Sequence, residues 1–190
     1  MANVTTSSIN VPIGAAIVEY GDEADKVVFD ITKGGITFSV ATSVQEVTVD
    51  QYGETPVKAI MKGRKAEAGV PFALHDLEKL AAVMPNSKFT KSGDKKKLVV
   101  NAQAGYDMLA GAKKMVIKPT DPAATPNDWI TIPMASAIAD PDYTYNADNE
   151  RVAKISFTAY PNKDTGILYI LGDETVTETE TKTVAKAVTK

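Results

Sequence analysis

Apolar and polar residues alternate along residues 34–49 in a way that predicts a long β-strand. The first apolar side chains all occupy even positions: Ile36, Phe38, Val40 and Val44. Small or hydroxyl-bearing residues separate them, and a period of two is typical of a strand. Val47 and Val49 are odd-numbered, so the apolar side chains change face along the strand. We expect a β-bulge or a sharp bend near Gln45 and Glu46, where the strand could switch sheets or layers.

The other apolar patterns predict further strands and one helix. Residues 74–84 place apolar side chains at i, i+3, i+4 and i+7, namely Leu77, Leu80, Ala81 and Met84. Pro85 and Asn86 end this helix. Strands are expected over residues 11–20, 26–31, 57–72, 98–101, 112–118, 129–134, 151–160 and 167–171. The pattern therefore predicts a mainly β fold, a β-sandwich or barrel with one flanking α-helix.

Glycine, proline and polar residues predict how these elements are connected. Gly34 and Gly35 are expected to allow a tight reversal, and the glycines within residues 57–72 imply bends or an internal hairpin. Loops are expected over residues 50–56, 87–97, 120–128 and 140–150. The length suits one domain over residues 11–172, with a flexible arm at 1–10 and a flexible, Thr/Glu/Lys-rich tail at 173–190.

Composition and charge narrow the function classes. The chain has no cysteine, which fits a reducing compartment and removes thiol catalysis and cysteine-based metal sites. Its net charge of −3 argues against a surface that grips nucleic acid, which normally carries a basic patch. No secretory signal and no apolar run of membrane-spanning length is recognised in the sequence.

No group of residues forms a recognisable active site, so no enzyme activity, cofactor or metal is expected. His75 is the only histidine, and a lone histidine beside a helix start is typical of a surface or capping residue. The acidic segment 140–150 fails as an EF-hand, because Tyr145 and Arg151 stand where glycine and glutamate are needed. The Lys95–Lys97 triplet is interpreted as a solvated loop or strand edge, and Trp129 as a core or interface anchor.

One stretch resembles a known family. The segment VDQYGETPV at residues 49–57, followed by a basic strand and the helical sequence LHDLEKLAAVMPN, is similar to the major tail proteins (tail tube proteins) of long-tailed bacteriophages. The similarity extends more loosely to residues 129–133 and 155–161, and it covers about two thirds of the chain.

This resemblance implies a structural virion protein. Its subunits would form stacked rings, expected to be hexameric, that make a hollow tail tube for genome ejection. The implied partners are other copies of the chain, the tape measure protein and tail tip or terminator proteins, with DNA only transiently in the lumen and no membrane. The chain would be assembled in the host cytoplasm and end in the virion tail. The alternatives are the tube of a contractile injection or secretion machine, a small-ligand-binding β-barrel, and an enzyme.

Two sets of residues are candidates for this assembly. Residues 50–69 form an extended, mixed-charge segment that could contact neighbouring subunits, and a solvated hairpin is the competing interpretation. Its interface candidates are Asp50, Glu54, Lys58, Lys62, Arg64, Lys65 and Glu67. Small polar residues that could line the lumen are Thr37, Ser39, Ser43, Glu46, Ser156 and Thr158. The competing interpretation of that face is that the helix around Leu77 and Leu80 covers it.

Overall fold

The computed structural model describes residues 14–73, 75–143, 145 and 151–177. The predicted arm at 1–10, most of the loop at 140–150 and residues 178–190 of the tail lie outside this description. The described elements are β1 (Ala16–Tyr20), β2 (Val27–Phe29), β3 (Thr37–Thr48), the 3-10 turn η2 (Asp50–Tyr52), β4 (Pro56–Phe72), α1 (Leu77–Val83), β5 (Ser87–Ser92), β6 (Lys95–Val100), β7 (Lys113–Pro119), the 3-10 turn η3 (Pro126–Asp128), β8 (Ile130–Asp142), β9 (Val152–Ala159) and β10 (Ile170–Leu171).

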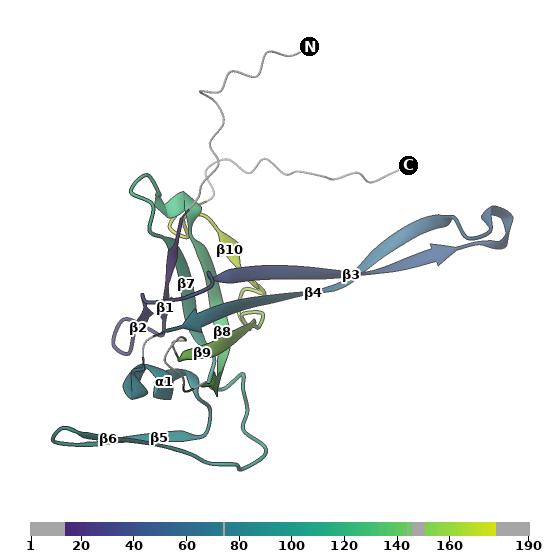
Figure 1. Cartoon of the computed structure of the whole chain (residues 1–190). Helices are drawn as coiled ribbons and strands as arrows, with labels where there is room; N and C mark the ends of the chain where they lie inside the picture. Colours follow the sequence, from purple (N-terminus) through teal and green to yellow (C-terminus); the bar gives the residue numbers. More distant parts are fainter. Residues whose placement is uncertain (1–13, 74, 144, 146–150, 178–190) are drawn as a thin grey trace.

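One large antiparallel sheet dominates the molecule (Figure 1). Its strand order is β2-β1-β7-β8-β9-β4-β3, and β10 pairs with the first residues of β8. The residues just after β2 return to the far side of the sheet, because Thr32 bridges Phe72 of β4. The sheet therefore curls until its two sides meet. The predicted mainly β fold with one helix is confirmed, and its form is a barrel closed by this bridge.

The glycine pair has a different role from the predicted reversal. Gly34 and Gly35 both have positive φ angles, 102° and 85°, as expected for glycine. However, Thr32 and Thr37 both pair antiparallel with β4, opposite Phe72 and Gly69. The chain therefore continues in one direction past the glycines. They form an irregular link between two stretches along the same edge of β4.

The interior of the barrel is filled with apolar side chains. Phe29, Phe72 and Phe157 are fully buried and come from three different strands. Their rings meet edge to face, with centroids 5.1 Å apart for Phe29 and Phe72 and 6.5 Å for Phe29 and Phe157. Small residues of the facing strands, such as Ala66 and Ala135, are also fully buried. Aromatic rings and small side chains together therefore fill the centre of the barrel.

The helix lies at one end of the barrel, as the sequence predicts, but it is shorter. It starts after Asp76, whose carboxylate accepts a hydrogen bond from the Glu78 amide at 3.0 Å, an N-cap that satisfies a helix terminus. It packs beside β2, β5, β6 and β8. Its buried residues are Leu80 and Val83, which join the barrel core. Val83 was not part of the predicted stripe.

Two stretches that the sequence does not predict as strands are strands in the structure. Strand β8 continues from Ile130 to Asp142 although the sequence predicts its end at Met134. Pro133 lies where the register between β7 and β8 shifts, and a bulge tolerates a missing amide. Residues 87–97 are predicted as a polar loop but form β5 and the start of β6. The Gly93-Asp94 pair connects these strands as a two-residue turn.

Candidate assembly interface

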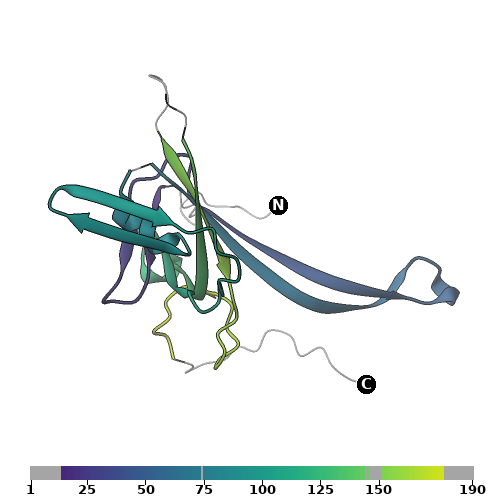
Figure 2. The ribbon, with the colours of Figure 1, turned by 90° about the horizontal axis from the view of Figure 1, so that it is seen from below.

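Strands β3 and β4 run far beyond the rest of the sheet and form a projecting arm (Figure 2). Strand β4 pairs with β9 only from Glu67 to Phe72, whereas it pairs with β3 along nearly its whole length. We define the arm as residues 41–65. Its tip holds the η2 turn and Gly53, whose φ is 60°. The predicted internal hairpin in residues 57–72 is wrong, because β4 is one continuous strand.

The pairing of β3 with β4 shows where the arm contains irregularities. The register shifts between Ser43 and Val44 and again between Val47 and Thr48. Ser43 pairs with Gly63 but Val44 pairs with Met61, so the extra residue is Lys62 on β4. The predicted bulge within β3 near Gln45 and Glu46 is therefore wrong in position. Strand β3 stays paired with β4 and does not switch sheets. The physical reason is that either strand of a pair can supply the extra residue of a bulge.

The arm carries apolar side chains on both faces, and all of them are exposed. Val44 and Met61 lie opposite each other on one face, with exposed fractions of 51% and 57%. Val47 and Ile60 belong to the other face by the same register, because residues that pair directly share a face. Further exposed apolar residues at the tip are Val49, Tyr52 and Val57. A two-stranded ribbon of this kind is marginal alone, and clustered apolar exposure marks an interaction surface.

All seven interface candidates lie on the arm or at its base. Asp50 and Glu54 are at the tip, and Glu67 is where β4 joins the sheet. Glu67 is in an ion pair with Lys65 of the same strand at 2.7 Å. The remaining candidates follow β4 between these ends: Lys58, Lys62 and Arg64. The structure therefore gathers them on one projection, and their contact with a neighbouring subunit stays a prediction.

Four of the six lumen candidates meet on one face of the sheet. Thr37 and Ser156 flank Gly69 from the two sides of β4, and together they line a shallow groove. The next row places Ser39 and Thr158 on the two sides of Glu67 in the same manner. These residues come from β3 and β9, far apart in the sequence. They form a small, polar outer face, which we call the polar face.

The other two lumen candidates lie on the arm. Ser43 continues the polar face, because it has the same parity in β3 as Thr37 and Ser39. Glu46 has the opposite parity and therefore projects from the other face of the arm. It cannot line the same wall as Ser43. The prediction that Glu46 lines one wall with Ser43 depended on a bulge within β3, which the register does not show at this position.

The helix does not cover the polar face. Leu80 and Val83 of α1 are buried in the barrel core, whereas Thr37, Ser39 and Ser156 are exposed. Their neighbours along the strands, such as Ala68 and Phe157, point into the core. The polar face is thus the outer side of the sheet. The competing interpretation of a helix-covered face is wrong.

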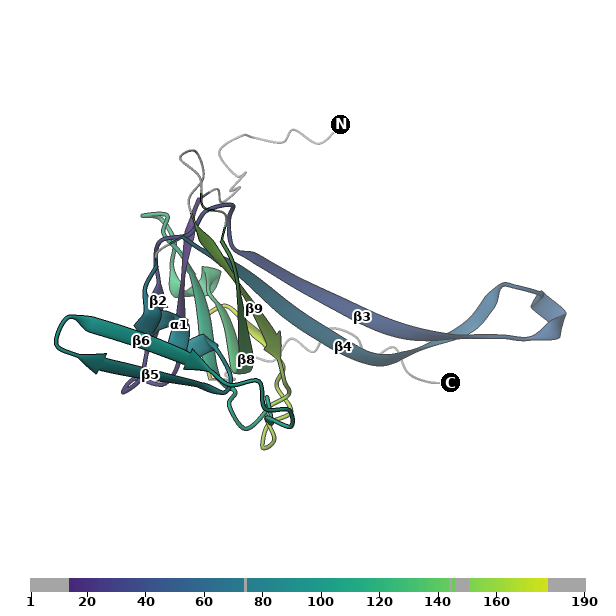
Figure 3. The ribbon, with the colours of Figure 1, turned by 60° about the horizontal axis from the view of Figure 1, so that its bottom comes forward.

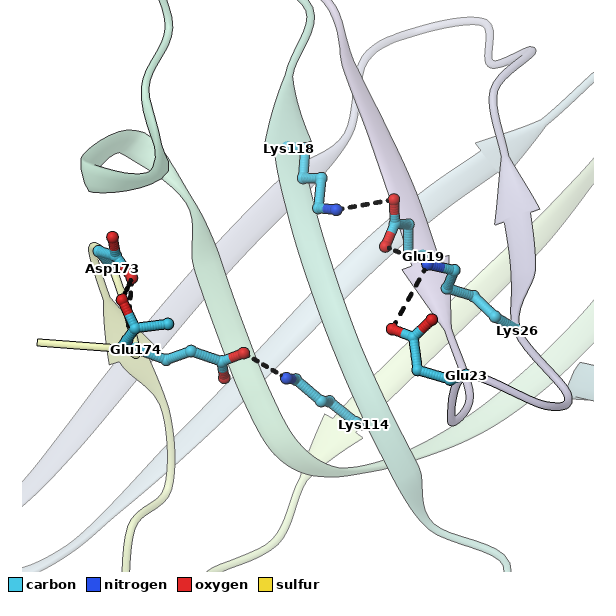
Figure 4. A network of polar contacts seen from close by, with 8 residues as sticks. Glu19, Glu23, Lys26, Lys114, Lys118, Asp173 and Glu174 are labelled. Carbon is cyan, nitrogen blue, oxygen red and sulfur yellow. Dashed lines mark hydrogen bonds and ion pairs between the residues drawn. The ribbon is translucent and has the colours of Figure 1, made fainter.

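Charges on the barrel itself are mostly paired with one another (Figure 4). Glu19 of β1 contacts Lys118 at 2.8 Å and Lys26 at 3.3 Å. Burial raises the pKa of Glu19, but the hydrogen bonds and charges of these two lysines outweigh it and hold the pKa below its ordinary value. Lys114 is paired with Glu174 in the segment after β10. Glu19 and Glu174 on this face are thus paired with lysines of the same chain.

Trp129 lies at this network and not in the core. The ammonium group of Lys118 lies 4.3 Å from the centre of the indole ring, a cation–π contact, and the side chain is half-buried. The part of the prediction that made Trp129 a core anchor is therefore wrong. Its alternative role as an interface anchor stays a prediction.

The described residues show no candidate metal site. Across residues 14–73, 75–143, 145 and 151–177, no group of three or more His, Asp or Glu side chains is placed to hold a metal ion. His75 packs its ring against Tyr143, with centroids 5.7 Å apart. No described helix has the length and apolarity to cross a lipid bilayer. The absence of enzyme activity stays a prediction.

Comparison with known proteins gives solved structures only. Neither a protein-family model nor a curated protein matches the chain. A chain of the PVC sheath-tube complex of an extracellular contractile injection system, in the extended state, is 14% identical with a TM-score of 0.45, over 83% of this chain and 95% of that one. The tube-terminating cap of the anti-feeding prophage is 16% identical with a TM-score of 0.42, over 83% of this chain and 94% of that one.

Proposed function

We propose that this chain is a structural subunit that self-assembles into a tube, and specifically the major tail protein of a bacteriophage tail. Six copies would form each ring, and the stacked rings would enclose the conduit for genome ejection. The observation that carries the proposal is the arm. It exposes apolar side chains on both faces, and only neighbouring copies placed on both sides of it would bury them.

The edges of the sheet support the same proposal. Strand β3 is the last strand of the sheet, and its outer edge offers unpaired backbone groups over twelve residues. Such an edge is prone to aggregation unless another strand pairs with it. Pairing with the next copy around a ring would satisfy the edge and close the ring. Stacking of rings then needs contacts between unlike surfaces, which build open-ended filaments.

The polar face suits the wall of the conduit. Its hydroxyl-bearing residues Thr37, Ser39, Ser156 and Thr158 carry no charge, and the charge of Glu67 beside them is balanced by Lys65. DNA binds proteins mainly through lysine and arginine contacts to phosphate. A wall that lacks unpaired cations would let DNA pass without being held. Lys154 at the end of this face is itself paired with Asp142 at 3.5 Å.

Electron microscopy of the purified protein tests the proposal directly. We expect rings or tubes that increase with protein concentration, with six subunits in each ring. Cysteines introduced at Thr37 or Ser39 should react in assembled tubes with a small maleimide and be shielded from a polymer-linked one. Persistent monomers at high concentration would contradict the self-assembly, and equal labelling by both reagents would place the polar face outside.

The proposed assembly defines the partners and the main alternative. In a phage tail the tube would contact the tape measure protein inside and terminator and tip proteins at its ends, and it would be built in the host cytoplasm. A tube of a contractile injection machine would use the same self-assembly. Particles purified from the source separate the two, because only a phage tail is attached to a DNA-filled capsid. The aromatic-filled interior disfavours a ligand-binding barrel.

A further inference from the structure

The β5–β6 hairpin carries an unusual charge. It contains Lys88, Lys91, Lys95, Lys96 and Lys97 against Asp94 alone, so five positive charges and one negative charge give a net +4. All five lysines are exposed. We call this element, residues 87–100, the lysine hairpin. It pairs with no other strand of the described chain, and Figure 3 shows it projecting away from the barrel.

These lysines differ from those of the barrel in lacking partners. Lys26, Lys79 and Lys118 are each in an ion pair within the chain. None of the five lysines of the lysine hairpin forms an ion pair with a described residue. Within the hairpin, Lys91 and Lys96 are directly opposite each other, and like charges in that position destabilise a strand pair. A local cost of this kind, with no gain inside the subunit, indicates a function outside it.

The arm tip has the complementary charge. Residues 46–58 contain Glu46, Asp50 and Glu54 against Lys58 alone, which lies opposite Val47, so three negative charges and one positive charge give a net −2. These carboxylates are exposed, and they also form no ion pair with a described residue. Each cluster has exposed apolar neighbours as well. Tyr52 lies at the tip, and Val99 lies on the hairpin.

The acidic arm tip and the lysine hairpin of one subunit cannot contact each other. In Figures 1, 2 and 3 the arm and the lysine hairpin project from opposite sides of the barrel. The twelve residues of β3 place the tip about 40 Å from the start of this strand, at about 3.3 Å per residue. A second copy of the chain is therefore the partner that can bring a tip to a hairpin. Opposite projection is also the arrangement that lets one contact repeat from copy to copy.

We propose that the acidic arm tip of one subunit docks on the lysine hairpin of another. This inference rests on the proposed self-assembly and specifies one of its contacts. The carboxylates of the tip would neutralise the lysines, and this would relieve the repulsion between Lys91 and Lys96. Tyr52 would add aromatic surface over which a lysine can lie. Because the two surfaces are unlike, each copy would offer one of each and the contact would propagate.

Charge reversal on the full chain tests the docking. The hairpin variant K95E/K96E/K97E would present two acidic surfaces, and the tip variant E46K/D50K/E54K two basic ones. Each alone should raise the protein concentration needed for assembly by about tenfold or more, since several exposed ion pairs are lost and replaced by repulsion. An equal mixture of the two variants should assemble again, because every contact in an alternating array is then complementary. The combined six-residue variant should also assemble.

Control variants show whether a loss of assembly is specific to the charge of the lysine hairpin. Lys163→Glu, an exposed lysine in a distant turn, should leave assembly unchanged, whereas Lys96→Glu should weaken it. Circular dichroism must show that each variant is folded. The milder variant K95Q/K96Q/K97Q should weaken assembly without being rescued by the tip variant. Higher salt should weaken wild-type assembly, because it screens exposed charges.

The inference is overturned if the hairpin variant assembles like the wild type, or if neither the mixture nor the combined variant recovers assembly. It is also overturned if the wild type shifts a DNA duplex on a gel and the hairpin variant, still assembling, does not; the lysines would then bind phosphate. In all of these cases the wild-type rings remain and the proposed function survives. A wild type that forms no assembly would instead remove the proposed function itself.

Discussion

The two halves of strand β4 differ in what surrounds their apolar residues. In the inner half, Ala66, Val70 and Phe72 are at most 1% exposed because β9 and the barrel interior lie against them. In the outer half, Ile60 and Met61 are 48% and 57% exposed although the strand continues without a break. Burial of apolar area is the main stabilising term in folding. The apolar residues of the inner half are therefore buried within their own subunit, and under the proposed assembly those of the outer half would be buried by another copy.

Shortening the arm should have the largest effect, because it removes the outer half of β4 and leaves the inner half in place. Because Ser43 pairs with Gly63, residues 44–62 can be replaced by Asn-Gly, a two-residue loop that closes an antiparallel pair. Assembly should be abolished, as measured by electron microscopy and sedimentation velocity. The far-ultraviolet circular dichroism should still show a folded β protein. The pair V44S/M61S keeps the arm at full length and should weaken assembly less. Normal tubes from the trimmed chain would contradict the role of the arm.

A matched pair of truncations compares the halves within the monomer. Phe157→Ala removes a fully buried ring that meets Tyr20 at 5.1 Å and Phe29 at 6.5 Å, and it should lower the free energy of unfolding by about 3–5 kcal/mol. Ile60→Ala should change it by no more than about 0.5 kcal/mol, as is usual for exposed sites. Urea unfolding of monomeric protein measures both. Similar losses for the two variants would mean that the arm is packed in the free subunit.

The buried hydroxyl of Tyr20 gives a smaller effect with a defined pH dependence. It donates a hydrogen bond to the Ala135 carbonyl at 3.2 Å, and Tyr20→Phe should cost about 1 kcal/mol. Burial, with a contribution from Tyr106, raises the pKa of Tyr20 to about 12. A raised phenol pKa means that the unfolded chain ionises first. Stability should therefore fall as the pH rises above about 10, and the Tyr20→Phe variant should lose this component in thermal melts.

The ion pairs of Glu19 should give the smallest effect, at the acid end of the pH range. The pKa of Glu19 is lower in the folded protein than its ordinary value of 4.5. Its contribution is thus fully present above that pH and is lost as the pH falls through the folded value. Glu19→Gln should flatten this part of the stability profile, at a cost of no more than about 1 kcal/mol near neutral pH. An unchanged acid profile would show that Lys118 and Lys26 do not favour the charged form.

Much of the fold is visible in local sequence patterns. Alternation of apolar residues locates β3 to within about three residues and β9 to within about one, because a strand with one buried face needs a period of two. The helix is located by its period of 3.6 residues and by Asp76 at its start. Strand β8 is missed beyond Met134 because its buried residues there are three alanines and Ser136. Alanine gives little contrast in hydrophobicity and has low strand propensity.

The candidate assembly interface is also only partly predictable from the sequence. The sequence alone identifies the arm as a mixed-charge, extended segment and the small polar residues of β3 as a separate face, since both follow from parity along one strand. It assigns Ser156 and Thr158 to the same lumen wall, but it does not show how they meet Thr37 and Ser39, because β9 and β3 are joined only through β4. It also gives no means of deciding which strand carries the bulge, and so it misplaces Glu46. The lysine hairpin is missed as a strand pair, although Gly93-Asp94 is a recognised two-residue turn signal.

By itself, then, the sequence determined most of the strands, the helix and the two apolar sets of β3, because these depend on neighbours within a few residues. The tertiary structure decided which of those apolar sets the subunit buries. The barrel closes where Thr32 bridges Phe72. The inner half of β4 is paired and buried there, whereas the outer half projects from the barrel. Local patterns report that a side chain is apolar. Only the packing of distant strands determines whether its partner lies in the same chain or in the next copy.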